Sequence, residues 1–270
     1  MAQLPGKTPI TVDDILAEDL YGLPIRARGE AGDLPPERIA RALRAAEDFY
    51  ERDLGIFLGL KRVKSDPIER GLDPSTFDVA DPAYDYESGM FTSDLWGRID
   101  LNYRPVAQVD KLFFSYPGTG FTSLFDVPAS WIRLDRKFGD LKIVPNTGAA
   151  LLAMSGYLLS VFAGGRSVPR SIFIDYTAGL DPDKMEDDHA ELLEGIRMRT
   201  VLNLMPTIAA VRGGGAGSHS ISQDGQSQSE SFAQGKYGPY SGSVELLKER
   251  ETEIRSTWVR QEHGVPFVVC

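Results

Sequence analysis

The stretch RSIFIDYTAGLDPDKMEDDHAELLEGIRMRTVLNL, residues Arg170–Leu204, changes from a strand pattern to a helix pattern. Its first part is rich in apolar and aromatic residues, as β-strands are, whereas Asp181 followed by Pro182 is a strong signal for the start of a helix. The acidic residues that follow favour the positive end of a helix dipole. Apolar residues at helical spacing then predict one buried stripe: Met185, Leu192, Leu193 and Ile196.

The predicted helix extends to Val211, and two further segments show helical patterns. Beyond Thr200 the sequence is apolar on most sides, which predicts burial against other elements or other subunits, and Pro206 is expected to kink or end the helix. Gly32–Leu58 repeats apolar residues at helical spacing. Ser243–Gly264 carries a narrow apolar stripe on a charged helix, so we expect it to pack against one neighbour only.

The strand patterns cluster in the middle of the chain, roughly from Trp96 to Tyr176. Ala129–Pro145 is the clearest hairpin, with Gly139 in its turn, whereas Ser65–Ser93 resembles an irregular surface segment. Because the strands do not alternate with helices, the pattern predicts an α+β fold. We expect a helical core made by the N-terminal, central and C-terminal helices, with an inserted antiparallel β-subdomain and a long polar loop.

The expected organisation has three parts. Residues 1–64 form an N-terminal helical segment, and residues 65–180 form the irregular region and the β-subdomain. Residues 181–270 supply the central helix, the polar loop, the C-terminal helix and a tail. We expect these parts to form one compact domain with extensions.

Composition limits the possible functions. The 270 residues carry a formal net charge of −10, which disfavours a protein that grips nucleic acid by neutralising its phosphates. It does not exclude a protein that DNA passes without binding, because a like-charged surface repels the backbone. The single cysteine, Cys270, is a poor candidate for a catalytic thiol because a terminal residue usually lacks fixed, electropositive surroundings.

Neither a targeting segment nor a membrane span is expected. Met1–Pro9 lacks the apolar centre of a signal peptide. The longest apolar run, Ala149–Ala163, is interrupted by polar residues and is too short to cross a bilayer.

No residue pattern predicts catalysis, a metal or a cofactor, so we expect a protein that is not an enzyme. The histidines His189, His219 and His263 show no metal-ligand spacing, and no cysteine cluster accompanies them. The acids between Asp181 and Glu194 are interpreted as a solvated helix face, and a Gly-x-Ser-x-Gly nucleophile motif does not occur.

The Gly-, Ser- and Gln-rich segment between Gly213 and Ser243 contains no Leu, Val or Met. It follows a predicted helix and lacks the lysine of a phosphate-binding loop, and it has too few carboxylates for a calcium loop. Two interpretations stay open: a flexible surface loop, or a segment that becomes ordered against a partner. The second is favoured by isolated apolar and aromatic residues that need a place to be buried: Ile221, Phe232, Tyr237 and Tyr240.

The opening stretch resembles the strand-to-helix passage of head–tail connector proteins of tailed bacteriophages. Those proteins carry an I-x-[ID]-Y-x-A-G strand end, which IDYTAG approximates here, followed by a helix that starts with proline. VPASWIRLDRKFGDLKIVPNTG and SHSISQDGQSQS are also similar to stretches of neck or adaptor proteins of larger phages. The resemblance covers Trp131–Ser231, and the order of the motifs is stronger evidence than any one of them.

The resemblance implies a structural virion protein that is made in the host cytoplasm and sits in the neck of the particle. Such adaptors form a ring of about twelve copies that docks under the portal protein, contacts a further neck or tail protein and lets DNA pass. The alternative is another virion structural protein, such as a tail terminator, a baseplate component or a capsid-associated protein.

The residues expected to contact other subunits or the portal lie in the polar segment, the last helix and the tail. The apolar tail GVPFVVC is expected either to enter a groove or sheet of a partner or to fold back on its own β-subdomain. The full set of expected contact residues is Ile221, Asp224, Phe232, Tyr237, Tyr240, Trp258, Pro266, Phe267, Val268 and Val269.

Overall fold

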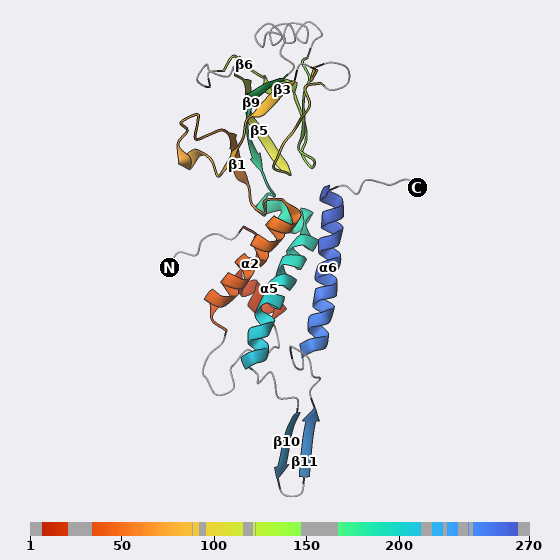
Figure 1. Cartoon of the computed structure of the whole chain (residues 1–270). Coiled ribbons are helices and arrows are strands. Elements are labelled where there is room, and N and C mark those ends of the chain that lie inside the picture. Colours follow the sequence, from red (N-terminus) through yellow and green to blue (C-terminus); the bar gives the residue numbers. More distant parts are fainter. Residues whose placement is uncertain are drawn as a thin grey trace, which may run out of the picture. The chain divides into compact units, whose positions relative to one another are not determined.

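The protein is described by a computed structural model that divides into two compact units, residues 1–54 with 183–270 and residues 55–182 (Figure 1). The structure describes residues 7–20, 34–87, 89–91, 96–115, 121, 123–146, 167–211, 218–223, 226–231, 237 and 240–263. Within these ranges, side chains are described except at positions 210–236 and 260–263. We call the two units the helical unit and the sheet unit and describe each by itself.

The helical unit is organised around α5 (Ala190–Val211), which packs against both α2 (Pro36–Leu54) and α6 (Ser241–His263) (Figure 1). The shorter elements are α1 (Val12–Asp14), the π-helix η1 (Ile15–Asp19), the 3₁₀-helix η4 (Pro182–Lys184) and α4 (Met185–Asp188). Pro206 does not end α5, which continues to Val211.

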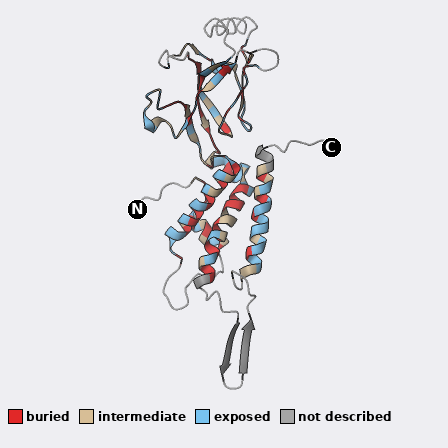
Figure 2. Ribbon diagram, viewed as in Figure 1, coloured by how far each residue is buried: buried red, intermediate tan, exposed pale blue. Residues whose placement is uncertain are grey.

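The core of the helical unit lies where α2 and α5 face each other (Figure 2). On α2 the buried residues recur every three or four positions, among them Ile39, Leu43, Ala46 and Tyr50. This spacing places them on one side of the helix, as the sequence predicts. On α5, which packs against α2, the buried residues include Leu192, Ile196, Leu204 and Ile208.

The sheet unit is built on a six-stranded sheet with β9 (Ser167–Ala178) at its centre. The strand order is β2-β1-β9-β5-β6, and β3 also pairs with β9. The other strands are β1 (Lys61–Ser65), β2 (Val79–Asp81), β3 (Tyr84–Glu87), β5 (Val106–Phe114) and β6 (Phe125–Asp126). Six successive residues of β9, from Ser171 to Tyr176, are buried, so both faces of this strand are covered.

A three-stranded sheet completes the sheet unit in the order β4-β8-β7. Its strands are β4 (Ile99–Asp100), β7 (Ile132–Asp135) and β8 (Asp140–Ile143), and 3₁₀-helices occur at Pro74–Thr76 (η2) and Ala129–Trp131 (η3). The predicted hairpin is confirmed, because Ile132 pairs with Ile143 and Leu134 with Leu141. Gly139 occupies its turn with a φ of +68°, a conformation that glycine adopts without a steric penalty.

The predicted fold, a helical core with an inserted antiparallel β-subdomain, is wrong. The fold is mixed: its largest sheet has six strands and a hydrophobic core of its own, which includes Val63, Leu112, Phe114, Ile172 and Ile174. The sheet is also not purely antiparallel, because β1 and β2 pair in parallel.

The source of this error lies in Ser65–Ser93, which the sequence predicts to be irregular. This segment contains β2 and β3, both very short and rich in Asp and Tyr. Pairing with β1 and β9 makes them strands, because cross-strand contacts outweigh the local preference of such residues for turns.

The expectation of a long polar loop between the helices also needs correction. Two strands, β10 (Ser218–Gln223) and β11 (Gln226–Ser231), form an antiparallel ladder there. Among the described strands, β10 and β11 pair only with each other. The two strands have the sequences SHSISQ and QSQSES, in which Ile221 is the one apolar residue.

Candidate docking cleft on the helical unit

The residues expected to contact partners have different surroundings. Ile221 lies in β10 opposite Gln228. Tyr237 is half-buried, with Lys248 Nζ 5.1 Å from the centre of its ring, and Tyr240 is half-buried just before α6. The remaining residues of the polar segment and tail lie outside the described residues: Asp224, Phe232, Pro266, Phe267, Val268 and Val269.

Trp258 packs inside the helical unit. Only 7% of it is exposed, and its ring meets His189 edge to face, with centroids 5.3 Å apart. This contact gives both residues a structural role within one protomer. It leaves little of the indole surface for a partner.

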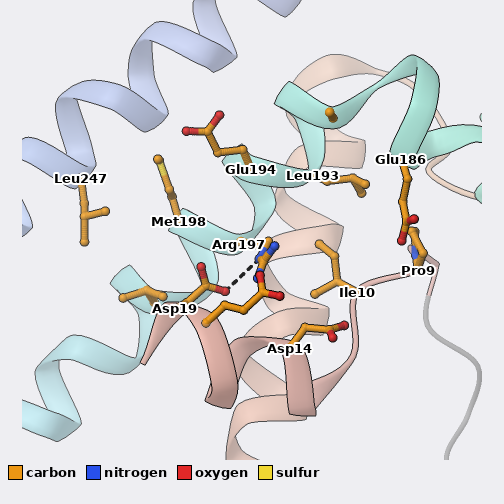
Figure 3. A pocket seen from close by; sticks show the side chains of 13 residues that line it. Pro9, Ile10, Asp14, Asp19, Glu186, Leu193, Glu194, Arg197, Met198 and Leu247 are labelled. Atoms are coloured by element: carbon orange, nitrogen blue, oxygen red, sulfur yellow. Dashed lines mark hydrogen bonds and ion pairs between the residues drawn. The ribbon is translucent and has the colours of Figure 1, made fainter. Parts of the chain in front are cut away.

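A cleft of about 550 Å³ lies in the helical unit between the N-terminal segment, α4, α5 and α6 (Figure 3). Its apolar lining residues are Pro9, Ile10, Leu193, Met198, Val201 and Leu247. Its acidic lining residues are Asp14, Glu18, Asp19, Glu186 and Glu194. The cleft therefore joins an apolar surface to a strongly acidic one.

A capping motif in the local sequence holds Asp14, the acid of α1 that lines the cleft, in place. Thr11 caps α1: its Oγ1 accepts a hydrogen bond from the Asp14 backbone N–H at 3.2 Å. In return the Asp14 carboxylate accepts the Thr11 backbone N–H at 2.7 Å, which completes a capping box. The Thr11 side-chain and backbone hydrogen bonds lower the pKa of Asp14, so this carboxyl remains charged at neutral pH.

Among the described residues that line the cleft, Arg197 is the only cationic one. It extends from α5 and donates a hydrogen bond from Nε to Asp19 at 2.9 Å, and its guanidinium also pairs with Glu18 (Figure 3). Partial burial works to lower the pKa of Arg197, but its hydrogen bonds to Glu18 and Asp19 outweigh that effect and raise it. These two bonds fasten η1 to α5 and so hold one wall of the cleft in place.

The opposite wall receives weaker electrostatic support. Glu194 lies 3.6 Å from Nε of Arg250, which also pairs with Glu253. Exposed pairs of this kind contribute little to stability. Glu186 is exposed and forms no ion pair with any residue that the structure describes. A negative charge thus remains along the α4–α5 side.

The lining of the cleft suits the binding of a cationic surface. Among the described residues, no group of three or more His, Cys, Asp or Glu side chains is placed to hold a metal ion. Buried leucine and isoleucine beside carboxylates suit a lysine or arginine, whose apolar stem covers the floor while its charge meets the rim. The cleft is therefore a candidate docking site for a basic protein surface.

Most of this site escapes prediction from the sequence. The acids from Asp181 to Glu194 are interpreted there as a solvated face, yet Glu186 and Glu194 line the cleft. The sequence marks Asp14 of α1 only by the capping pattern from Thr11 to Asp14, and no sequence pattern marks Glu18 and Asp19 of η1.

A second polar cluster, in the sheet unit, is structural. Asp81 is 2% exposed, and its carboxylate accepts hydrogen bonds from the Tyr84 hydroxyl at 2.7 Å, Asn102 Nδ2 at 2.9 Å and the Tyr176 hydroxyl at 3.2 Å. Burial raises the pKa of both tyrosines, so both hydroxyls stay protonated and act as donors. A buried carboxylate satisfied in this way joins β2 and β3 to β9.

Comparison of the sequence with models of known protein families finds no family that matches, and comparison with functionally curated proteins finds no similar sequence. In the part of the chain that the structure describes, no helix has both the length and the apolar character needed to cross a bilayer.

Proposed function

We propose that this chain is a structural virion protein of a tailed bacteriophage, a head–tail adaptor that forms a ring under the portal, joins the capsid to the tail and lets DNA pass. The proposal begins from the resemblance of Arg170–Leu204 to connector sequences. Its support from the geometry is that the helical unit carries an isolated strand pair and an acidic cleft, both of which suit contact with neighbouring molecules.

The observation that carries the proposal is the β10–β11 ladder. A two-stranded hairpin alone is at best marginally stable in water, and this one is made almost entirely of Ser, Gln, His and Glu. Among the described strands, neither pairs with a third. Both outer edges therefore offer backbone N–H and C=O groups to a strand of a partner.

Charge provides the second support. The chain has a formal net charge of −10. A ring built from such a chain repels the phosphate backbone, so DNA can move through its channel without being held.

The test is assembly with the portal protein of the same phage. Purified chain, alone and mixed with portal, is analysed by mass photometry. We expect a defined high-mass ring on the portal. A chain that stays monomeric and never binds portal contradicts the proposal.

A matched variant isolates the hairpin. Residues 218–231 are replaced by a Gly-Ser linker of equal length, which removes the ladder and keeps the connection between α5 and α6. We expect unchanged far-ultraviolet circular dichroism of the helices and loss of assembly on the portal. Unimpaired assembly of this variant removes the hairpin from the argument.

A further inference from the structure

The acidic cleft has a charge that its own protomer leaves unbalanced. Five carboxylates line it, and Arg197 is the one cation among its lining residues. Arg197 already pairs with Glu18 and Asp19, and Arg250, which also pairs with Glu253, forms an ion pair with Glu194 alone among the carboxylates that line the cleft. The half-buried apolar residues beside these carboxylates, Pro9, Met198 and Leu247, gain from contact with hydrocarbon, so a ligand with both apolar and cationic groups fits the cleft better than a purely ionic one.

The outward side of α2 carries a complementary surface, which we call the basic strip: Arg41, Arg44 and Arg52. All three are exposed, and none forms an ion pair with a described residue. Asp48 lies on the same side of the helix, but Lys7 Nζ pairs with it at 2.6 Å. The strip therefore presents guanidinium groups on flexible apolar stems, together with the exposed Ala45.

The basic strip and the cleft lie on different sides of the helical unit. The α5 side that meets α2 carries Arg199, whose guanidinium carbon is 3.9 Å from the ring centre of Phe49, and Asn203, which donates to the Ala42 carbonyl at 3.3 Å. Arg197, in the cleft, is two residues from Arg199 and so about 200° away around the helix. The strip faces outward from the far side of α2, so it cannot fill the cleft of its own protomer.

We infer that the acidic cleft of one protomer binds the basic strip of a second copy of this chain. Such a contact is head to tail: each copy uses its cleft on one neighbour and its strip on the other. A contact of this type closes into a ring when the rotation between copies permits and otherwise continues as a filament. The inference rests on the proposed function for the ring, and it adds the surfaces through which the copies join.

Charge reversal tests this pairing. One variant carries Arg41→Glu and Arg44→Glu, and another carries Glu186→Lys and Glu194→Lys. Sedimentation equilibrium at low and high salt measures self-association of each. We expect each variant to associate at least about tenfold more weakly than the parent, because the strip variant places like charges opposite the acidic cleft and the cleft variant removes the negative charge that attracts the strip.

The decisive variant combines all four substitutions in one chain. Two lysines on the α4–α5 side of its cleft then face two glutamates of the strip, so association is restored to within about threefold of the parent if these surfaces pair. The control is Glu245→Lys with Glu249→Lys, two exposed acids of α6 that do not line the cleft; it should associate like the parent.

Failure of the combined variant to regain association, or a parent chain that does not self-associate, overturns the inference. Portal binding by the same set of variants separates this failure from that of the proposed function. If portal binding persists without charge-dependent self-association, the pairing is wrong and the adaptor role stands. If self-association follows the charges but portal is never bound, the adaptor role is wrong and the pairing stands.

Discussion

Replacing Gly195 with alanine should destabilise the helical unit, although alanine is the better helix former. An alanine Cβ at this position in α5 would come within 2.5 Å of Tyr50 Oη, 3.1 Å of Tyr50 Cζ and 3.2 Å of Ile254 Cγ2. Tyr50 is 0% exposed, so its ring has no free space into which it can move. Either the ring or the spacing between α2 and α5 must change.

The magnitude follows from two opposing effects. Alanine is favoured over glycine inside a helix by about 1 kcal/mol. Excess volume in a packed core costs about 1–3 kcal/mol. With a contact as short as 2.5 Å, we expect the upper half of that range, and hence a net loss of about 1–2 kcal/mol in the free energy of unfolding.

A double-mutant cycle with Tyr50→Phe tests the cause. This substitution removes the buried Tyr50 hydroxyl, which interacts with the buried Glu251 carboxylate, and the cycle measures the cost of that loss separately. In that background Gly195→Ala should be close to neutral, which gives a coupling energy of about 1–2 kcal/mol. Urea unfolding followed by far-ultraviolet circular dichroism measures all four proteins.

The control is Gly242→Ala in α6, where no atom lies within 4 Å of the added Cβ. It should leave stability unchanged or slightly raised. If Gly195→Ala instead stabilises the protein by about 1 kcal/mol, helix propensity alone accounts for the change in the free energy of unfolding. The expected clash of the added Cβ with Tyr50 is then refuted.

Two further predictions concern buried charges. Burial raises the pKa of Glu47 above its ordinary 4.5, although hydrogen bonds from Thr8 act in the opposite direction. At pH values between 4.5 and the raised pKa, the folded state therefore binds more protons than the unfolded state. The free energy of unfolding consequently falls as the pH rises through this range. Glu47→Gln keeps the oxygen that accepts both Thr8 hydrogen bonds and should become more stable relative to the parent from about pH 4 to pH 7 in urea titrations; parallel pH profiles would contradict this. In the sheet unit, Asp175→Asn breaks the two-bond pair with Arg70, whose N–O distances are 2.6 and 3.0 Å, and should lower the free energy of unfolding by about 3 kcal/mol. Asp78→Asn, at the exposed pair with Arg62, is the matched control and should cost less than about 1 kcal/mol; equal losses at the two sites would show that burial of Arg70–Asp175 is not what matters.

Local patterns were enough to locate the elements whose burial follows a regular period. The spacing of Ile39, Leu43, Ala46 and Tyr50 predicts the buried side of α2, and the alternation around Gly139 predicts the hairpin β7–β8. In both cases the residues that pack together are close in sequence, so their spacing carries the information.

Elements made by distant partners could not be predicted in this way. β2 and β3 consist of residues that prefer turns, and they become strands through pairing with β1 and β9. The β10–β11 ladder escapes prediction for another reason: its strands are neighbours in sequence, but their composition, rich in Ser and Gln, lacks the alternation of apolar residues that marks a strand. Strand preference depends on the neighbouring strand, and the neighbour is decided by the fold.

The amphipathic helices, the β7–β8 hairpin and the acidic segment at the start of the central helix can all be located from the amino-acid sequence alone. The six-stranded sheet with its own core, and the cleft in which acids of η1 and α5 meet, become visible only in the folded chain. The difference arises from separation along the chain. Helical periodicity is a property of neighbouring residues, whereas the pair Asp19–Arg197 joins residues that only folding brings to 2.9 Å.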